Sequence, residues 1–134
     1  MSEKDFLQFC CLWCRNPLGH VDALHCSQNE IRPVLRDGEI FAACKTCLET
    51  VLWLERTLYP GILVSPGVVT RPDPWIATHT IRCMYCGSKL TADEKDRHRH
   101  FGESLVSFRG TVRGRCYLCS RNGARPSYQQ SASE

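Results

Sequence analysis

The feature that most constrains this chain is a repeated arrangement of cysteines. The motif C-x-x-C occurs four times, and the first two pairs recur in the last two at an offset of 72 residues. In each half, 29 residues separate the two pairs. Eight positions that agree on one offset indicate an internal duplication, because chance does not produce such agreement. The cysteines of the repeat are Cys11, Cys14, Cys44, Cys47, Cys83, Cys86, Cys116 and Cys119.

This spacing predicts metal binding. Two C-x-x-C pairs supply four thiolates, which complete a tetrahedral zinc shell and leave no position for water, so each site is structural. A redox protein would carry one C-x-x-C at the start of a helix in a βαβ unit, and four pairs in tandem do not fit that pattern. Turn-type residues follow each first pair, at 15–17 and 87–89, and suit zinc knuckles. We therefore expect two zinc ions per chain.

Ten cysteines would also suit a secreted disulfide protein, but the first residues do not resemble a signal peptide. They carry Glu3, Lys4 and Asp5 and contain no apolar h-region. No apolar run approaches the ~18 residues of a membrane helix. We therefore expect a reducing intracellular compartment, where clustered cysteines more often bind metal. The formal net charge of +3 fits an acidic partner and is weak evidence for nucleic acid.

Two cysteines fall outside the repeat. At the offset of 72, Cys10 corresponds to Arg82 and Cys26 corresponds to His98. We expect both cysteines to be small buried or half-buried thiols that do not bind metal. His98 and His100 lie in the charged run "DEKDRHRH", which is typical of a solvated helix face.

The repeat also divides the chain. We expect an N-terminal arm, a first zinc domain, a linker helix with a connector, a second zinc domain and a disordered polar tail. Each zinc domain is shorter than about fifty residues, so its apolar core is too small and metal binding must supply much of its folding energy. The expected segments are 1–9, 10–47, 48–75, 76–121 and 122–134.

Local patterns predict the elements of the first domain and the linker. One or two helical turns are expected at 19–26. Residues 31–44 are predicted to form two strands around a tight turn at 36–38, "RDG". A helix of about three turns is expected within 45–61, because its apolar residues have helical spacing and Pro60-Gly61 ends the run.

The second domain repeats this plan. Thr91 and Glu94 form a capping box, which predicts a helix that begins there and continues to about His98. Residues 103–116 are predicted to form strand, glycine turn and strand. The sequence thus indicates a small zinc-bound α+β protein made of two homologous four-cysteine domains.

The two C-x2-C-x29-C-x2-C units, with a linker helix between them, resemble the papillomavirus early protein six family of viral oncoproteins. The match runs from about Cys11 to Cys119. The stretches "RDG", "IRC.YC", "EK.RH" and "GRCY.C" are similar to that family, and "CLWC" and "CLE…ER" resemble animal-virus members more than high-risk human ones. The resemblance implies that each zinc domain has a short three-stranded sheet and short helices, and that a linker helix joins the domains.

The resemblance also implies a function without catalysis. Members capture acidic L-x-x-L-L helices of host proteins in a pocket between the two zinc domains and the linker helix. The mastermind-like Notch coactivator is the favoured partner here, and a HECT-type ubiquitin ligase or paxillin is an alternative. Such capture redirects or inhibits host regulators and alters transcription, differentiation and apoptosis. The expected location is the host nucleus and host cytoplasm, as a monomer or weak dimer with no membrane partner.

Such a peptide needs an apolar groove and a basic rim. By position, Ile31, Arg36, Leu48 and Arg82 are similar to pocket residues of the family, whereas one family arginine falls here at Thr111. Without the resemblance, the same apolar residues fit a core and the same arginines fit a solvated surface. The residues expected to bind the peptide are Ile31, Val34, Arg36, Ala43, Leu48, Val51, Leu52, Leu58, Arg82, Arg109 and Arg113.

Two other functions stay open. A nucleic-acid-binding transcription regulator fits the paired zinc modules and the basic stretch "RGTVRGRC", but no helix carries a dense Lys/Arg stripe. A RING-like ubiquitin ligase would need interleaved ligands, and the duplication favours two separate sites. No Ser/His/Asp set, P-loop or carboxylate pair indicates an enzyme. The ending "QQSASE" lacks the C-terminal hydrophobic residue of a PDZ-binding motif, so no PDZ-domain partner is expected.

Overall fold

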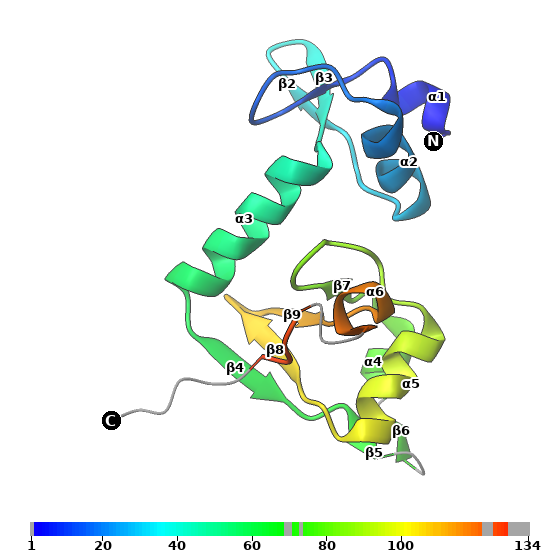
Figure 1. Cartoon of the computed structure of the whole chain (residues 1–134), viewed down its shortest axis with the longest axis vertical. Coiled ribbons are helices and arrows are strands. Elements are labelled where there is room, and N and C mark those ends of the chain that lie inside the picture. Colours follow the sequence, from blue (N-terminus) through cyan, green and yellow to red (C-terminus); the bar gives the residue numbers. More distant parts are fainter. Residues whose placement is uncertain (1, 69–70, 73, 122–124, 129–134) are drawn as a thin grey trace. The chain divides into compact units, whose positions relative to one another are not determined.

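The chain folds into two compact units in the computed structural model, which describes residues 2–68, 71–72, 74–121 and 125–128. Unit 1 is Met1–Val51 and unit 2 is Leu52–Glu134. The boundary lies within helix α3 (Lys45–Leu58), which lies in the predicted range and, at 14 residues, is longer than the three turns expected. Each unit contains short helices and a small sheet that includes a hairpin, and unit 2 also contains a separate two-stranded sheet (Figure 1). The α+β class and the two homologous four-cysteine units are therefore confirmed.

Unit 1 contains a three-stranded sheet with the order β1-β3-β2. Strand β1 (Cys10–Cys11) runs parallel to β3 (Glu39–Ala42), and β3 forms the predicted antiparallel hairpin with β2 (Val34–Arg36). Helices α1 (Glu3–Phe6) and α2 (His20–Gln28) pack against each other. The parallel pair places the first cysteine pair beside the end of the hairpin, where the second pair begins.

The core of unit 1 is small and includes the N-terminal residues. Phe6 of α1 is fully buried, and its ring meets the ring of Phe9 edge to face at 5.8 Å between centroids. The arm therefore packs as part of this unit. The buried cluster consists of Phe6, Cys11, Leu18, Ala23, Cys26 and Ala42.

Unit 2 has the same plan with one more strand. Its sheet has the order β4-β8-β9-β7, in which β7 (Arg82–Cys83) is parallel to β9 (Thr111–Gly114) and β8 (Leu105–Phe108) forms the hairpin with β9. The fourth strand is β4 (Gly61–Val64), which is antiparallel to β8. The unit also contains strands β5 (Gly67–Val68) and β6 (Arg71–Pro72) and helices α4 (Pro74–Thr78), α5 (Ala92–Phe101) and α6 (Tyr117–Ser120).

The expectation of a three-stranded sheet is therefore wrong for unit 2. The sequence "GILV" at 61–64 lies in the segment expected to be a connector, but its apolar residues pair along the whole length of β8. The expectation of a disordered tail is also wrong for residues 125–128, since Tyr128 packs against Phe108. The rest of that tail lies outside the described residues.

The duplication extends to the backbone conformation. Eight described residues have a positive φ, and they form four pairs at the offset of 72 that relates the cysteines. The left-handed region favours glycine, yet half of these positions carry other residues, so the shared turns impose this conformation. The pairs are Arg15 with Gly87, Glu30 with Gly102, Asp37 with Arg109 and Gly38 with Gly110.

A carboxylate at the third position of α2 and of α5 joins two parts of its unit. In unit 1, Asp22 Oδ2 accepts a hydrogen bond from the Gly19 N–H at 3.2 Å, which caps α2. Its other oxygen, Oδ1, accepts from the Lys45 N–H at 2.8 Å, at the start of α3. The side chain therefore fixes α2 to the segment that carries the second cysteine pair.

Glu94 has the same role in unit 2 and offers a test. Its Oε1 accepts from the Thr91 N–H at 2.8 Å and its Oε2 accepts from the Tyr117 N–H at 2.7 Å. Glu94→Ala leaves two amide donors without their charged acceptor, so we expect a loss of about 1.5–3 kcal/mol in the unfolding free energy of unit 2. Urea denaturation of the zinc-loaded chain measures this loss. Asp93→Ala, an exposed neighbour in the same helical turn, is the control, and equal losses in the two variants would contradict the assigned role.

Candidate functional site

The eight cysteines of the repeat gather into two groups, one in each unit. Within each group, the four Sγ atoms lie within 4.8 Å of one another. The Sγ atoms of Cys14 and Cys44 are 3.9 Å apart, and those of Cys86 and Cys116 are 3.6 Å apart. A tetrahedron of zinc–sulfur bonds about 2.3 Å long needs sulfurs about 3.8 Å apart, so both groups fit the ion. The chain therefore has sites for two zinc ions, and an interleaved RING arrangement is wrong because each group takes its ligands from one half.

A tight turn presents the first pair of each group. In unit 1, the Cys11 N–H donates to the Asn16 carbonyl at 2.9 Å and the Arg15 N–H donates to the Cys11 carbonyl at 3.0 Å. In unit 2, the corresponding bonds are Cys83 N–H to Ser88 O and Gly87 N–H to Cys83 O. The second pair lies at a helix start, with Cys44 just before α3 and Cys116 at the N-cap of α6.

One thiol in each group is held close to its ionised form. Burial opposes ionisation of Cys11, but backbone N–H groups of Cys44, Cys14 and Trp13 outweigh it and lower its pKa to about 6. Hydrogen bonds from Cys116 and Cys119 lower the pKa of Cys83 to about 7. The neighbouring sulfurs, Cys116 first, raise the pKa of Cys119. Four thiolates this close need a bound cation to ionise together, and this is the role of a structural zinc ion.

The two groups differ in exposure to solvent. In unit 1, Cys14 is exposed and Cys44 and Cys47 are half-buried. In unit 2, the four cysteines are between 0% and 8% exposed. A chelator therefore reaches the zinc shell of unit 1 more easily.

We expect native mass spectrometry to find two zinc ions per chain. Cys11→Ser and Cys83→Ser should each lose one ion and unfold their own unit first, because binding and folding are coupled. A chelator should release zinc in two phases, and Cys11→Ser should abolish the faster phase. Cys10→Ser, outside both groups, is the control and should keep both ions and both phases. One zinc ion, or a disulfide in place of metal, would contradict the assignment.

The two remaining cysteines lie as expected. Cys26 is fully buried and its Sγ–H donates to the Ala43 carbonyl at 3.2 Å, whereas Cys10 is half-buried in β1. Neither belongs to a four-cysteine group of the described residues. Cys26 therefore packs in the core of unit 1.

His98 corrects the expectation of a solvated helix face, because its side chain is 0% exposed. Its Nε2 accepts from the Arg115 N–H at 3.0 Å, so Nδ1 carries the proton and donates to the Glu103 carbonyl at 3.0 Å. Burial is the main reason why the pKa of His98 is lowered. The repeat contained the missed signal, since His98 corresponds to the buried Cys26 at the offset of 72.

A cluster of charges surrounds this histidine and adjoins Cys116. The Glu103 carboxylate accepts from Arg97 Nη1 at 3.0 Å and from Arg115 Nη2 at 2.5 Å. Burial opposes ionisation of Glu103, but the two guanidinium groups outweigh it and lower its pKa. The cluster fixes the end of the hairpin next to the second cysteine pair of unit 2.

Acid is therefore expected to destabilise unit 2 in two stages. Below about pH 6.5 an unfolded histidine binds a proton that the buried His98 resists, so stability falls as the pH drops below that value. The contribution of Glu103 is present above about pH 4.5 and is lost as the pH falls through its lower folded pKa. Denaturation of the zinc-loaded chain at a series of pH values, followed by NMR signals of unit 2, measures both stages.

His98→Gln should flatten the first stage, although it lowers stability at neutral pH. His100→Gln, on the same helix but exposed, is the matched control and should keep the wild-type slope. An unchanged slope in His98→Gln would show that another group causes the first stage.

The apolar residues expected to bind a peptide differ in accessibility. Four are half-buried, two are buried and one is exposed. Leu48 and Val51 are half-buried and three residues apart on α3, so they lie on one face of that helix. The half-buried residues are Ile31, Val34, Leu48 and Val51, the buried residues are Ala43 and Leu52, and the exposed residue is Leu58.

The four arginines expected to bind a peptide differ in the groups that they contact. Arg113 forms an ion pair with Glu55, with 3.1 Å between Nε and Oε1, and Arg109 lies 4.6 Å from the centre of the Tyr59 ring. Both guanidinium groups are thus engaged within unit 2. Arg36 is exposed and donates to the Leu35 carbonyl. Arg82 is half-buried and donates to the Gly87 carbonyl.

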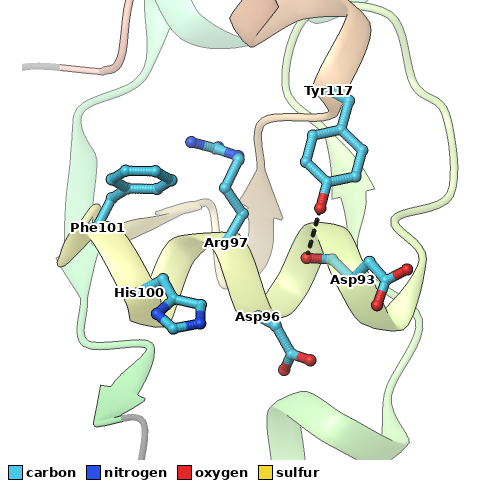
Figure 2. A pocket seen from close by; sticks show the side chains of 6 residues that line it. All are labelled: Asp93, Asp96, Arg97, His100, Phe101 and Tyr117. Atoms are coloured by element: carbon cyan, nitrogen blue, oxygen red, sulfur yellow. Dashed lines mark hydrogen bonds between the residues drawn. The ribbon is translucent and has the colours of Figure 1, made fainter.

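A hollow of about 440 Å³ lies on α5 and was not expected from the sequence. Figure 2 shows Phe101 and Tyr117 on either side of Arg97, with the Tyr117 hydroxyl donating to the Asp93 carbonyl at 3.1 Å. The Arg97 guanidinium is already paired with Glu103. These side chains offer no nucleophile with an adjacent base. The hollow is lined by Asp93, Asp96, Arg97, His100, Phe101 and Tyr117.

Comparison with known proteins gives a consistent result. The model of the early protein E6 family matches residues 11–119. Protein E6 of European elk papillomavirus is 51% identical over 131 residues, which covers 98% of this chain and 97% of that protein. Protein E6 of Odocoileus virginianus papillomavirus 1 is 48% identical over 92% of this chain and 91% of its own length. Protein E6 of bovine papillomavirus type 1 is 42% identical over 88% of each chain.

A human relative matches at lower identity, since protein E6 of human papillomavirus 3 is 32% identical over 86% of this chain and 76% of its own length. None of these names is that of an enzyme. In the part of the chain that the structure describes, no helix is both long enough and apolar enough to span a membrane.

Proposed function

This chain belongs to the early protein E6 family of papillomavirus oncoproteins, and on that premise we propose that it is a non-enzymatic adaptor that captures acidic L-x-x-L-L helices of host proteins. The observation that carries the proposal is the family match over 11–119, which includes both zinc groups and helix α3. Zinc has a structural role in this proposal, because both shells are complete without substrate.

The apolar residues of α3 support the proposal. Leu48 and Val51 form a partly accessible apolar face, and leucines of an amphipathic partner helix need such a surface. Burial of apolar area, at roughly 25 cal/mol per Å², supplies most of the binding free energy. Leu52, four residues after Leu48 on the same helix, is buried and therefore offers less surface to a partner.

The contacts of the four arginines indicate which of them are available for the proposed basic rim. Arg113 is paired with Glu55 and Arg109 stacks on Tyr59, so their charges are partly used. Arg36 and Arg82 donate to the backbone carbonyls of Leu35 and Gly87, and we place them at the rim because their positions are similar to those of family pocket residues. Charges at such a rim mainly set orientation and the association rate.

The proposed partners follow from the family resemblance. We place the mastermind-like Notch coactivator first and a HECT-type ubiquitin ligase or paxillin after it, with action in the host nucleus and cytoplasm. Binding to nucleic acid is less favoured, because two arginines of "RGTVRGRC", Arg113 and Arg115, are paired with Glu55 and Glu103.

We expect titration with acidic L-x-x-L-L peptides from these host proteins to give saturable binding. Leu48→Glu places a charge in the apolar face and should abolish binding. Arg82→Ala should weaken binding by about 1–3 kcal/mol if the pair is partly desolvated, and by less if it is exposed. Higher salt should narrow the difference between wild type and Arg82→Ala, because screening weakens exposed pairs first.

Two controls keep this test specific. Leu118→Glu introduces the same charge at an exposed leucine of α6 and should bind as wild type does. Arg109→Ala should change the affinity less than Arg82→Ala. If Leu48→Glu retains both zinc ions and its fold yet binds with unchanged affinity, α3 does not line the site and the proposal fails.

A further inference from the structure

Residues 125–128, Arg-Pro-Ser-Tyr, follow the last zinc ligand and are held against unit 2. The Arg125 N–H donates to the Cys119 carbonyl at 2.7 Å, and Arg115 Nη1 donates to the Arg125 carbonyl at 2.6 Å. One residue later, the Tyr85 hydroxyl donates to the Pro126 carbonyl at 2.5 Å. Three successive bonds thus fix the start of the segment to the knuckle region of unit 2.

The end of the segment is anchored by Tyr128. Its ring meets the fully buried Phe108 edge to face, with centroids 5.3 Å apart and planes at 90°. Its hydroxyl accepts from the Gly61 N–H at 3.1 Å. A Cβ atom at Gly61 would lie 2.6 Å from Cζ and from the hydroxyl oxygen of this tyrosine, so only glycine leaves room for the ring. Gly61 and Phe108 therefore form a socket for one side chain.

The socket lies at the first residue of β4, which is an edge strand of the sheet. Edge strands present unpaired N–H and C=O groups that attract other strands. The two central residues of β4 are apolar and stay exposed with residues 125–128 in place, at 64% for Ile62 and 44% for Leu63, so Tyr128 covers this edge only at Gly61. An uncovered edge with such residues is a site for strand pairing between molecules.

We propose that residues 125–128 form a C-terminal strap, a closing device that belongs to the fold of unit 2 and protects the start of this edge at Gly61. The closed strap satisfies the Gly61 N–H and covers Phe108 with an aromatic ring. It also joins the knuckle at Tyr85, the hairpin at Phe108 and β4 at Gly61. The strap is short and half-buried, so it opens locally while the rest of unit 2 stays folded. The proposal does not depend on peptide capture.

Tyr128 variants of the zinc-loaded full chain test the strap. Tyr128→Phe keeps the ring but leaves the Gly61 N–H without its acceptor, so hydrogen exchange of this amide should accelerate roughly tenfold. Tyr128→Ala also removes the ring, so exchange should accelerate along β4, and sedimentation should show self-association that grows with concentration. Tyr117→Phe, which loses a hydroxyl on the exposed α6, is the matched control and should leave β4 unchanged.

A second substitution tests the socket from the other side. Gly61→Ala places a methyl group against the tyrosine ring and should reproduce the effect of Tyr128→Ala. In a Tyr128→Ala background the added methyl still meets Val106 at 2.7 Å but no longer meets the tyrosine ring, so its further effect should be smaller. The proposal is overturned if the Gly61 amide of the wild type exchanges as fast as an unstructured one, or if both Tyr128 variants match the wild type in exchange and sedimentation.

Discussion

The fold depends on two sets of zinc–thiolate bonds. Each set joins a knuckle to a helix start about thirty residues later in the same unit, and so closes a loop that a small apolar core could not hold alone. The ligands are also part of the cores. Cys11 is buried in the unit 1 cluster and Cys44 and Cys47 pack against it, while all four ligands of unit 2 are buried in theirs. Loss of metal therefore disrupts the packing as well as the cross-link.

Unit 1 depends on this cross-link more than unit 2 does. Among the described residues, its buried cluster has six members, against twelve in unit 2. Unit 2 also has a fourth strand and the Glu103 charge cluster, which hold the hairpin independently of the metal. Unit 1 therefore has both the more exposed zinc ligands and the smaller apolar core.

The two units have different core side chains at corresponding positions, and a larger residue at one position is matched by a smaller residue at a neighbouring one. At the offset of 72, Cys26 corresponds to His98 and Ala42 corresponds to Gly114. A Cβ atom at Gly114 would lie 3.1 Å from His98 Nε2 and 2.5 Å from a methyl of Leu90, so the larger histidine needs the smaller neighbour. Unit 1 combines the smaller cysteine with alanine in the same buried cluster. One backbone plan therefore accepts two core packings of similar total volume.

Much of this architecture could be predicted because its signals are local or exactly repeated in sequence. The cysteine spacing predicted both metal groups, the "RDG" turn predicted a hairpin, and Thr91 with Glu94 predicted the start of α5. Three features depend on distant partners instead. Strand β4 needs β8 to pair with, His98 is buried by the hairpin and its flanks, and Tyr128 needs the socket at Gly61. No local pattern carries that information.

The distribution of charge bears on how an acidic partner would be recognised. The net charge of +3 already sets every acid against every base, but it does not show which basic groups are engaged: Arg97 and Arg115 pair with Glu103, and Arg113 pairs with Glu55. These pairs hold unit 2 together and are partly shielded from solvent. These three arginines are less available to an acidic helix, and under the proposed function apolar contacts with α3 would supply most of its affinity. Acidic residues of the partner would then serve mainly to select its orientation and speed its approach.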